Sequence, residues 1–154
     1  RLARSIDHMA VQLKHLESAR AQFIGEVSHD LRTPLTAIKG LLVNLIENAL
    51  RYGGHGVEVA AHVSGDSNAP YVVLSVLDRG TGIDPGELGE IFNPFIRGDK
   101  ARGGQGAGLG LAIVKRIASQ HGGVIELRNR EGGGLEARVS LPLGLLLPRD
   151  AVKQ

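Results

Sequence analysis

The sequence predicts an α+β fold, in which an N-terminal coiled-coil or helical-bundle arm precedes a two-layer α/β sandwich. Two periodicities and a glycine pattern predict it: apolar residues follow a heptad repeat at the start, alternate with period two in later segments, and flank two glycine-rich loops. A heptad repeat is typical of helices that pack along an apolar seam, and a two-residue repeat is typical of half-buried strands. Because aromatics are only 3% of the chain, the core is expected to consist of Leu, Val, Ile and Ala.

The predicted arm covers residues 1–39. Apolar residues recur there at steps of four and three, at Leu2, Ile6, Met9, Leu13, Leu16, Phe23 and Val27. Arg20 interrupts this apolar seam. Pro34 is expected to kink the helix and Gly40 to form a joint, because both residues weaken a helix interior. An isolated helix leaves such a seam exposed, so a homodimer through residues 2–27 is expected.

The remaining elements follow from the period and from the turn residues between them. They are a helix at 41–52, strands at 57–63 and 71–77, a helix at about 109–121, and an antiparallel hairpin of 124–129 and 135–143. The expected domains are a relay helix and linker (1–22), a phosphoacceptor-type helix (23–40), an α/β domain (41–142) and a frayed tail (143–154).

Composition excludes several classes of function. The 18 basic and 16 acidic residues leave a charge of +2, and no basic arm is visible, which disfavours a nucleic-acid-binding coiled coil. The absence of Cys excludes disulfides and thiolate metal sites and fits a cytoplasmic location. No apolar run reaches the roughly 20 residues that span a bilayer. Because Met is not the first residue, we expect the chain to be part of a longer protein.

Two glycine-rich loops are candidate ligand sites. In "DRGTGID", Asp78 follows a strand as a hydrogen-bond acceptor, and Gly80 and Gly82 let the backbone approach a flat ligand. In "GGQGAGLGLAIV", Gly106 to Gly110 leave backbone N–H groups free at a helix N-terminus, where the helix dipole favours a phosphate. Taken singly, the first loop is also compatible with an ordinary turn, and the second with a flexible connection.

Two helical segments carry further candidates. Asn44, Asn48, Arg51 and Tyr52 share one stripe, whose amide oxygens suit Mg²⁺ and whose arginine suits a phosphate; the alternative is a solvated polar face. His29 stands beside Asp30, and a neutral imidazole can attack a phosphoryl group when a neighbour takes its other proton; the alternative is a surface histidine.

Together, and in this order, the asparagine helix, the DxGxG loop and GxGxGLGLA resemble the ATP-binding domain of sensor histidine kinases, within the wider gyrase–Hsp90–MutL fold. "SHDLRTPL" at 28–35 resembles the phosphoacceptor box of the same kinases, and the preceding helix resembles a signal-relay (HAMP-like) helix. The resemblance covers nearly all of residues 1–142. It implies a sandwich of the histidine kinase/Hsp90-like ATPase type, ATP and Mg²⁺ as cofactors, and autophosphorylation followed by transfer to an aspartate of a response-regulator receiver domain.

The resemblance also implies individual roles. His29 accepts the phosphoryl group, Asp30 assists it, and Thr33 positions water in the phosphatase reaction. Asn48 is the magnesium ligand, and Asp78 accepts the adenine amino group. The other residues implied at the nucleotide are Asn44, Arg51, Tyr52, Gly80, Gly82, Phe92, Phe95, Arg97, Lys100, Arg102, Gly106, Gly108, Leu109 and Gly110.

One departure from the family pattern is large. Complete kinases carry a second bundle helix and the first strands of the ATP domain between the phosphoacceptor box and the asparagine helix, and this chain lacks that segment. We therefore expect nucleotide binding to survive and autophosphorylation to be impaired; the alternative is a non-catalytic nucleotide-binding and dimerisation module. A plain ATPase is disfavoured, because Asn44 stands where those enzymes carry a glutamate base. The relay helix implies the cytoplasmic portion of a membrane-anchored bacterial protein, with the anchor outside this sequence.

Overall fold

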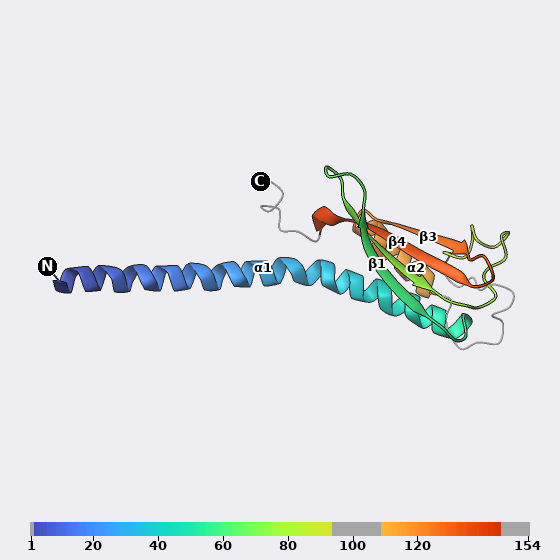
Figure 1. Ribbon diagram of the computed structural model, residues 1–154, viewed down its shortest axis with the longest axis horizontal. Helices are drawn as coiled ribbons and strands as arrows, with labels where there is room; N and C mark the ends of the chain where they lie inside the picture. Colours follow the sequence, from blue (N-terminus) through green and yellow to red (C-terminus); the bar gives the residue numbers. More distant parts are fainter. Residues whose placement is uncertain (1, 94–108, 146–154) are drawn as a thin grey trace.

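The computed structural model describes residues 2–93 and 109–145, which form a long helical arm and a compact α/β head. The arm and part of the helix layer of the head belong to the same helix, α1 (Leu2–Tyr52), which is 51 residues long. Figure 1 shows its first half projecting away from the head and its axis changing direction near the middle. The arm therefore has no partner within the described residues, and its apolar side chains are exposed.

The predicted break between two helices at Gly40 is wrong, because α1 continues through that residue. A Cβ at position 40 would lie 3.3 Å from Cδ1 of Ile117 in the second helix. The glycine thus lets two helices approach closely instead of providing a joint. Pro34 lies inside α1, where its ring is buried and the helix continues past it.

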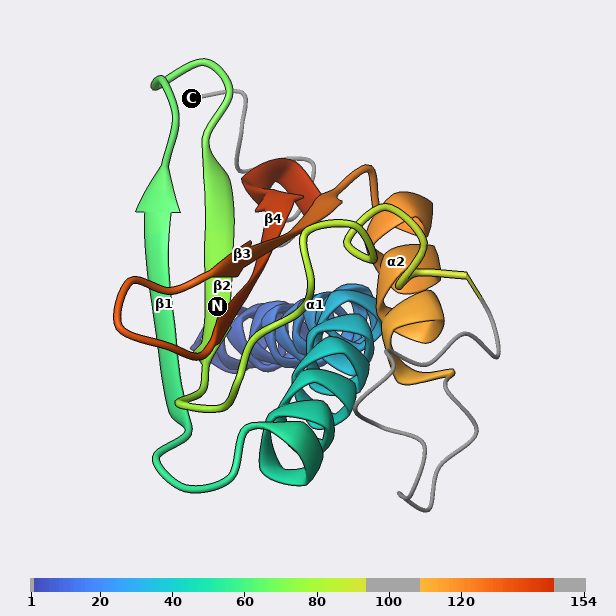
Figure 2. The same ribbon diagram turned by 90° about the vertical axis from the view of Figure 1, so that its right-hand side faces the viewer.

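The head contains a four-stranded antiparallel sheet with the order β1-β2-β4-β3. The remaining elements are β1 (Glu58–Ser64), β2 (Tyr71–Leu77), α2 (Gly110–Gln120), β3 (Val124–Asn129), β4 (Leu135–Pro142) and the short 3₁₀ helix η2 (Leu143–Leu145). The α+β class, the four strands and the final hairpin are confirmed, with boundaries within one residue of those predicted. Figure 2 shows α1 and α2 side by side beneath the sheet.

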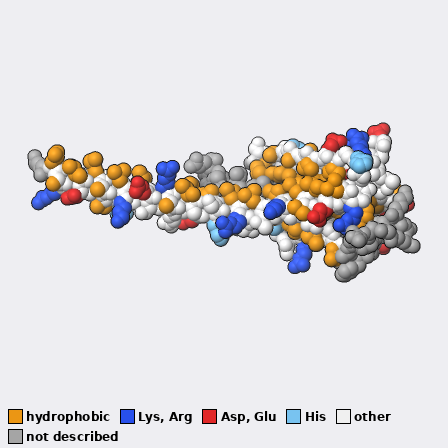
Figure 3. Space-filling model, turned by 90° about the horizontal axis from the view of Figure 1, so that it is seen from below, with side chains coloured by type: hydrophobic (Ala, Val, Ile, Leu, Met, Phe, Trp, Pro, Cys, Tyr) orange, Lys and Arg blue, Asp and Glu red, His pale blue; other side chains and the backbone are white. Residues whose placement is uncertain are grey.

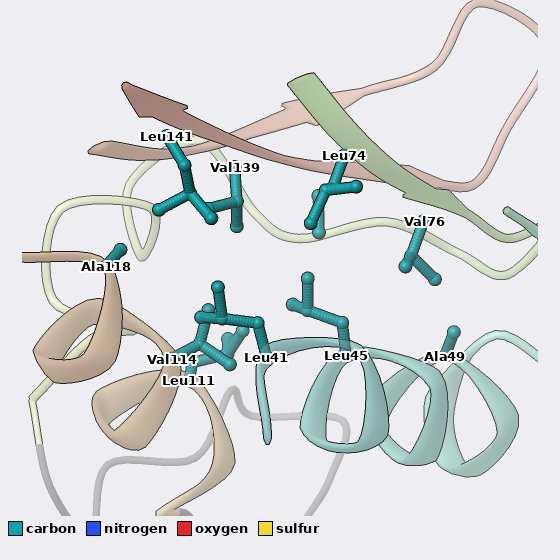
Figure 4. Packing of buried hydrophobic residues seen from close by; sticks show 11 residues of the cluster. Leu41, Leu45, Ala49, Leu74, Val76, Leu111, Val114, Ala118, Val139 and Leu141 are labelled. Atoms are coloured by element: carbon teal, nitrogen blue, oxygen red, sulfur yellow. The ribbon is translucent and has the colours of Figure 1, made fainter. Parts of the chain in front are cut away.

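The core lies between this helix layer and the sheet, and Figure 4 shows its side chains pointing toward one another from both layers. Residues three or four apart on each helix supply one side: Leu41, Leu45 and Ala49 from α1, and Leu111, Val114 and Ala118 from α2. Alternate residues of the central strands supply the other side: Leu74, Val76, Ala137, Val139 and Leu141. As predicted, the buried cluster is aliphatic.

Candidate functional site

The best-defined polar group of the head is the carboxylate of Asp78, directly after β2. Asp78 is only 6% exposed, and its Oδ1 accepts hydrogen bonds from the backbone N–H groups of Gly80 at 2.9 Å and Leu135 at 3.0 Å. Within the described residues no hydrogen bond reaches Oδ2, and no fully buried side-chain oxygen there lacks a partner, so Oδ2 is not completely buried. The carboxylate is thus fixed through Oδ1, and Oδ2 keeps its capacity to accept a hydrogen bond.

Glycines bring three segments together around this carboxylate. A Cβ at Gly53, after the end of α1, would collide with the Cβ of Asp78, and a Cβ at Gly80 would lie 2.7 Å from the Tyr52 carbonyl oxygen. Gly134 has a φ of +102°, and a Cβ there would collide with the carbonyl group of Asp78. The close approach requires glycine at all three positions, which assembles the end of α1, the loop after β2 and the start of β4.

The loop after β2 is held by residues that the sequence analysis missed. The side chain of Asn129 donates to the carbonyl of Ile83 at 2.7 Å and accepts from its N–H at 2.9 Å. Gly82, with a φ of +74°, makes room for this amide, and Arg130 donates to the Asp78 carbonyl at 2.7 Å. These partners lie about fifty positions downstream, so no local motif indicates them.

The asparagine stripe of α1 lies on the side next to α2. Asn44 donates from Nδ2 to the carbonyl of Gly40 at 2.8 Å, and its Oδ1 lies 3.8 Å from the Cβ position of Gly110. Asn48, one turn later, is half-buried, while Arg51 and Tyr52 are exposed. Asn44 therefore borders the N-terminus of α2, and both asparagines are half-buried, so a fully solvated stripe does not describe them.

The N-terminus of α2 has no side-chain cap within residues 2–93 and 109–145. Its preceding residue, Leu109, accepts a hydrogen bond from Ile113. Uncapped N–H groups and the helix dipole together favour an anion. Phe92 packs against the core, with the ammonium of Lys115 5.3 Å from its ring centroid. The other predicted loop residues lie outside the described residues: Phe95, Arg97, Lys100, Arg102, Gly106 and Gly108.

The predicted phosphoacceptor residues are far from these groups. His29 is on the exposed arm, with 82% of its side chain accessible, and its Nδ1 lies 3.8 Å from Oδ1 of Asp30. Thr33, one turn further along, is also exposed. His29 and Asn48 are nineteen residues apart on one continuous helix, which corresponds to about 28 Å. The structure thus brings Asp78 next to the end of α1 and Asn44 next to the start of α2, and it separates both from the predicted acceptor.

Residues 35–145 match the family model described as histidine kinase-, DNA gyrase B- and HSP90-like ATPase. Among curated proteins, the chain is 41% identical over 125 residues to the sensor protein KdpD of Escherichia coli K12, covering 75% of the chain and 14% of KdpD. It is 38% identical over 132 residues to the sensor histidine kinase GtrS of Pseudomonas aeruginosa, covering 85% of the chain and 26% of GtrS. The chain thus spans about a quarter or less of these relatives.

Solved structures of sensor histidine kinases have a similar fold. The mycobacterial sensor histidine kinase MprB superposes with a TM-score of 0.60 at 29% identity, covering 70% of this chain and 72% of that one. Full-length ShkA in complex with AMPPNP gives a TM-score of 0.56 at 31% identity, covering 69% of this chain and 21% of ShkA.

None of the helices in residues 2–93 and 109–145 combines the length and hydrophobicity needed to span a membrane.

Proposed function

The chain belongs to the family of histidine kinase-, DNA gyrase B- and HSP90-like ATPases, and we propose from this premise that it is the catalytic part of a sensor histidine kinase. Its head binds ATP, and the γ-phosphoryl group passes to His29 and then to an aspartate of a response-regulator receiver domain. The observation that carries the proposal is that one helix, α1, contacts both candidate regions: its C-terminal end packs against Asp78, and its Asn44 lies beside the first residue of α2.

In this proposal Asp78 recognises the adenine ring. Its Oδ1 is occupied by two backbone N–H groups, whereas Oδ2 is available to accept a hydrogen bond from the exocyclic amino group of adenine. Because the carboxylate is anchored before the ligand arrives, little side-chain entropy is lost on binding. Gly80 and Gly82 let the loop after β2 pack against Tyr52 and Asn129, and the exposed side chain of Tyr52 is available to cover the adenine ring.

The phosphates belong between α1 and α2. Backbone N–H groups of the first turn of α2, beginning at Gly110, attract their negative charge, and Arg51 supplies a guanidinium on the α1 side. The donor set also fits Mg²⁺, because Asn48 offers a neutral amide oxygen and the cation takes few protein ligands. When bound, Mg²⁺ would supply charge compensation for the triphosphate. Asn44 replaces an acidic base, so water is not activated and the phosphoryl group is kept for the acceptor.

The chemistry at the acceptor follows from the position of Asp30. Its carboxylate lies on the Nδ1 side of His29, which leaves Nε2 free to attack. The new bond joins Nε2 to the γ-phosphorus, the bond from that phosphorus to the bridging oxygen breaks, and ADP leaves with the bond's electrons. The carboxylate takes the proton of Nδ1, so that the phosphorylated ring is neutral.

The distance between His29 and the nucleotide site determines whether the phosphoryl group is transferred within one chain or between two chains. In-line transfer requires reacting atoms within about 3–3.5 Å, whereas the continuous helix α1 holds His29 about 28 Å from Asn48. Transfer within one chain is therefore impaired, and the head of one chain phosphorylates His29 of another. Exposure of the apolar seam of the arm, with Phe23 66% accessible, supports association of two chains through α1.

A second candidate function has a specific observation in its favour. Since α1 is unbroken at Gly40, the chain is also compatible with a nucleotide-binding and dimerisation module that has lost its reaction. Incubation with Mg²⁺ and γ-labelled ATP, beside a His29→Gln control, separates the two. Acid-labile, alkali-stable phosphate that depends on His29 supports the kinase. Its absence, together with retained ADP binding, supports the module.

A further inference from the structure

The edge strand β1 is unusually open. Among the strands that the structure describes, β1 pairs only with β2, and Figure 2 shows its other side free. Six of its seven residues are exposed. Its outer edge therefore presents backbone N–H and C=O groups that another strand can pair with.

One side of β1 is apolar. Val59 lies opposite Val76 of β2, and Val63 opposite Val72. Directly opposed residues point to the same face of a sheet. Because Val76 and Val72 pack in the core against the helices, both β1 valines also face the helix layer. They remain 52% and 63% exposed because the helices cover the neighbouring strands instead. Figure 3 shows hydrophobic side chains gathered on the head in the view from below.

β1 also lacks the usual protection against pairing. Edge strands are normally protected by lysines, prolines or inward charges, and the sequence EVAAHVS contains none of these in its centre. Its one acidic residue, Glu58, is at the first position and lies 3.5 Å from Arg79 of the same chain. A second strand can therefore approach without meeting an unpaired charge.

We propose that β1 pairs antiparallel with β1 of a second copy, about a two-fold axis at Ala61. The strand is self-complementary in this register, because Val59 then faces Val63 on the helix side and Ala60 faces His62 on the other side. A two-fold axis makes both contacts occur twice. The two sheets become one, and the two apolar patches meet on the same face. Any other register moves the two-fold axis away from Ala61, and Val59 then no longer lies opposite Val63.

Single cysteines test this register, because the chain has no native cysteine. Directly opposed residues have Cα atoms about 4.5–5.5 Å apart, within reach of a disulfide. Ala61→Cys should therefore cross-link with itself under mild oxidation. Val59→Cys and Val63→Cys should cross-link only when mixed, since equivalent copies of either lie about 14 Å apart along the strand.

The expected result is at least about tenfold more disulfide dimer for Ala61→Cys, and for the mixture, than for Val63→Cys alone. Thiol titration confirms that each cysteine is reactive, and circular dichroism that each variant is folded. Equal cross-linking of Val63→Cys alone, or a reactive but uncross-linked Ala61→Cys, overturns the proposal. Association through the arm does not affect the comparison, because all variants share the same α1, and the assay needs no nucleotide.

Discussion

Replacement of Asp78 by asparagine separates its structural role from its role in binding. The carboxylate offers one oxygen to the N–H groups of Gly80 and Leu135, and in the proposed complex it offers the other oxygen to adenine. Asparagine has a single acceptor oxygen, so it cannot serve both. If the oxygen keeps its backbone partners, the amide NH₂ faces the adenine amino group, and two donors oppose each other.

The magnitudes follow from these contacts. Loss of the adenine hydrogen bond should cost about 1.5–3 kcal/mol, which is a roughly 10- to 150-fold increase in the Kd for ADP. Asp78→Asn should keep both backbone bonds in weaker, uncharged form and lose about 2 kcal/mol of folding stability. Asp78→Ala removes both bonds to a charged acceptor and should lose about 3–6 kcal/mol.

Titration with a fluorescent ADP analogue and urea unfolding measure the two effects. Asp84→Asn is the matched control, because Asp84 is exposed and its carboxylate accepts from the N–H of Gly86 at 2.8 Å in the same loop. It should leave the Kd within about twofold, as expected for a surface substitution. If Asp78→Asn bound ADP as tightly as this control, adenine recognition by Asp78 would be refuted.

Three further substitutions test the fold that positions the site. Gly134→Ala should lower the urea midpoint well beyond Gly132→Ala, since both have positive φ but only the first would collide with a carbonyl; equal midpoints would contradict this packing. Leu41→Ala should cost about 2–5 kcal/mol in urea unfolding, whereas Leu35→Ala, 58% exposed on the same helix, should cost under about 0.5. Asn129→Ala should weaken ADP binding and speed amide exchange at Ile83, and unchanged exchange would exclude its role in holding the loop.

Local patterns predicted much of the head. Strands β1 and β2 could be located because alternation and turn residues are properties of neighbouring positions. The helix that ends at Tyr52 was predicted for the same reason, through the apolar stripe that includes Leu41 and Leu45. Asp78 stood out because an acceptor follows a strand and precedes two glycines.

The errors and omissions involve contacts between distant segments. Gly40 was interpreted as a joint because its neighbour Ile117 is far along the chain, and only packing shows that the glycine serves close approach. Gly53 and Gly134 follow a predicted helix and precede a predicted strand, where glycine is common, although both also border Asp78. Asn129 gave no signal, since an asparagine at the end of a strand is common and its hydrogen bonds reach back 46 positions.

The central claim is that the head carries the nucleotide site and phosphorylates His29 of another chain. A mixture tests it directly: His29→Gln retains the head but lacks the acceptor, and tagged Asp78→Asn retains the acceptor but has a weakened head. With Mg²⁺ and γ-labelled ATP, the account predicts acid-labile label on the tagged chain in the mixture, much less on either variant alone, and a wild-type rate per chain that rises with concentration. Labelling of wild-type chains at a rate independent of concentration, with none on the tagged chain in the mixture, would contradict it.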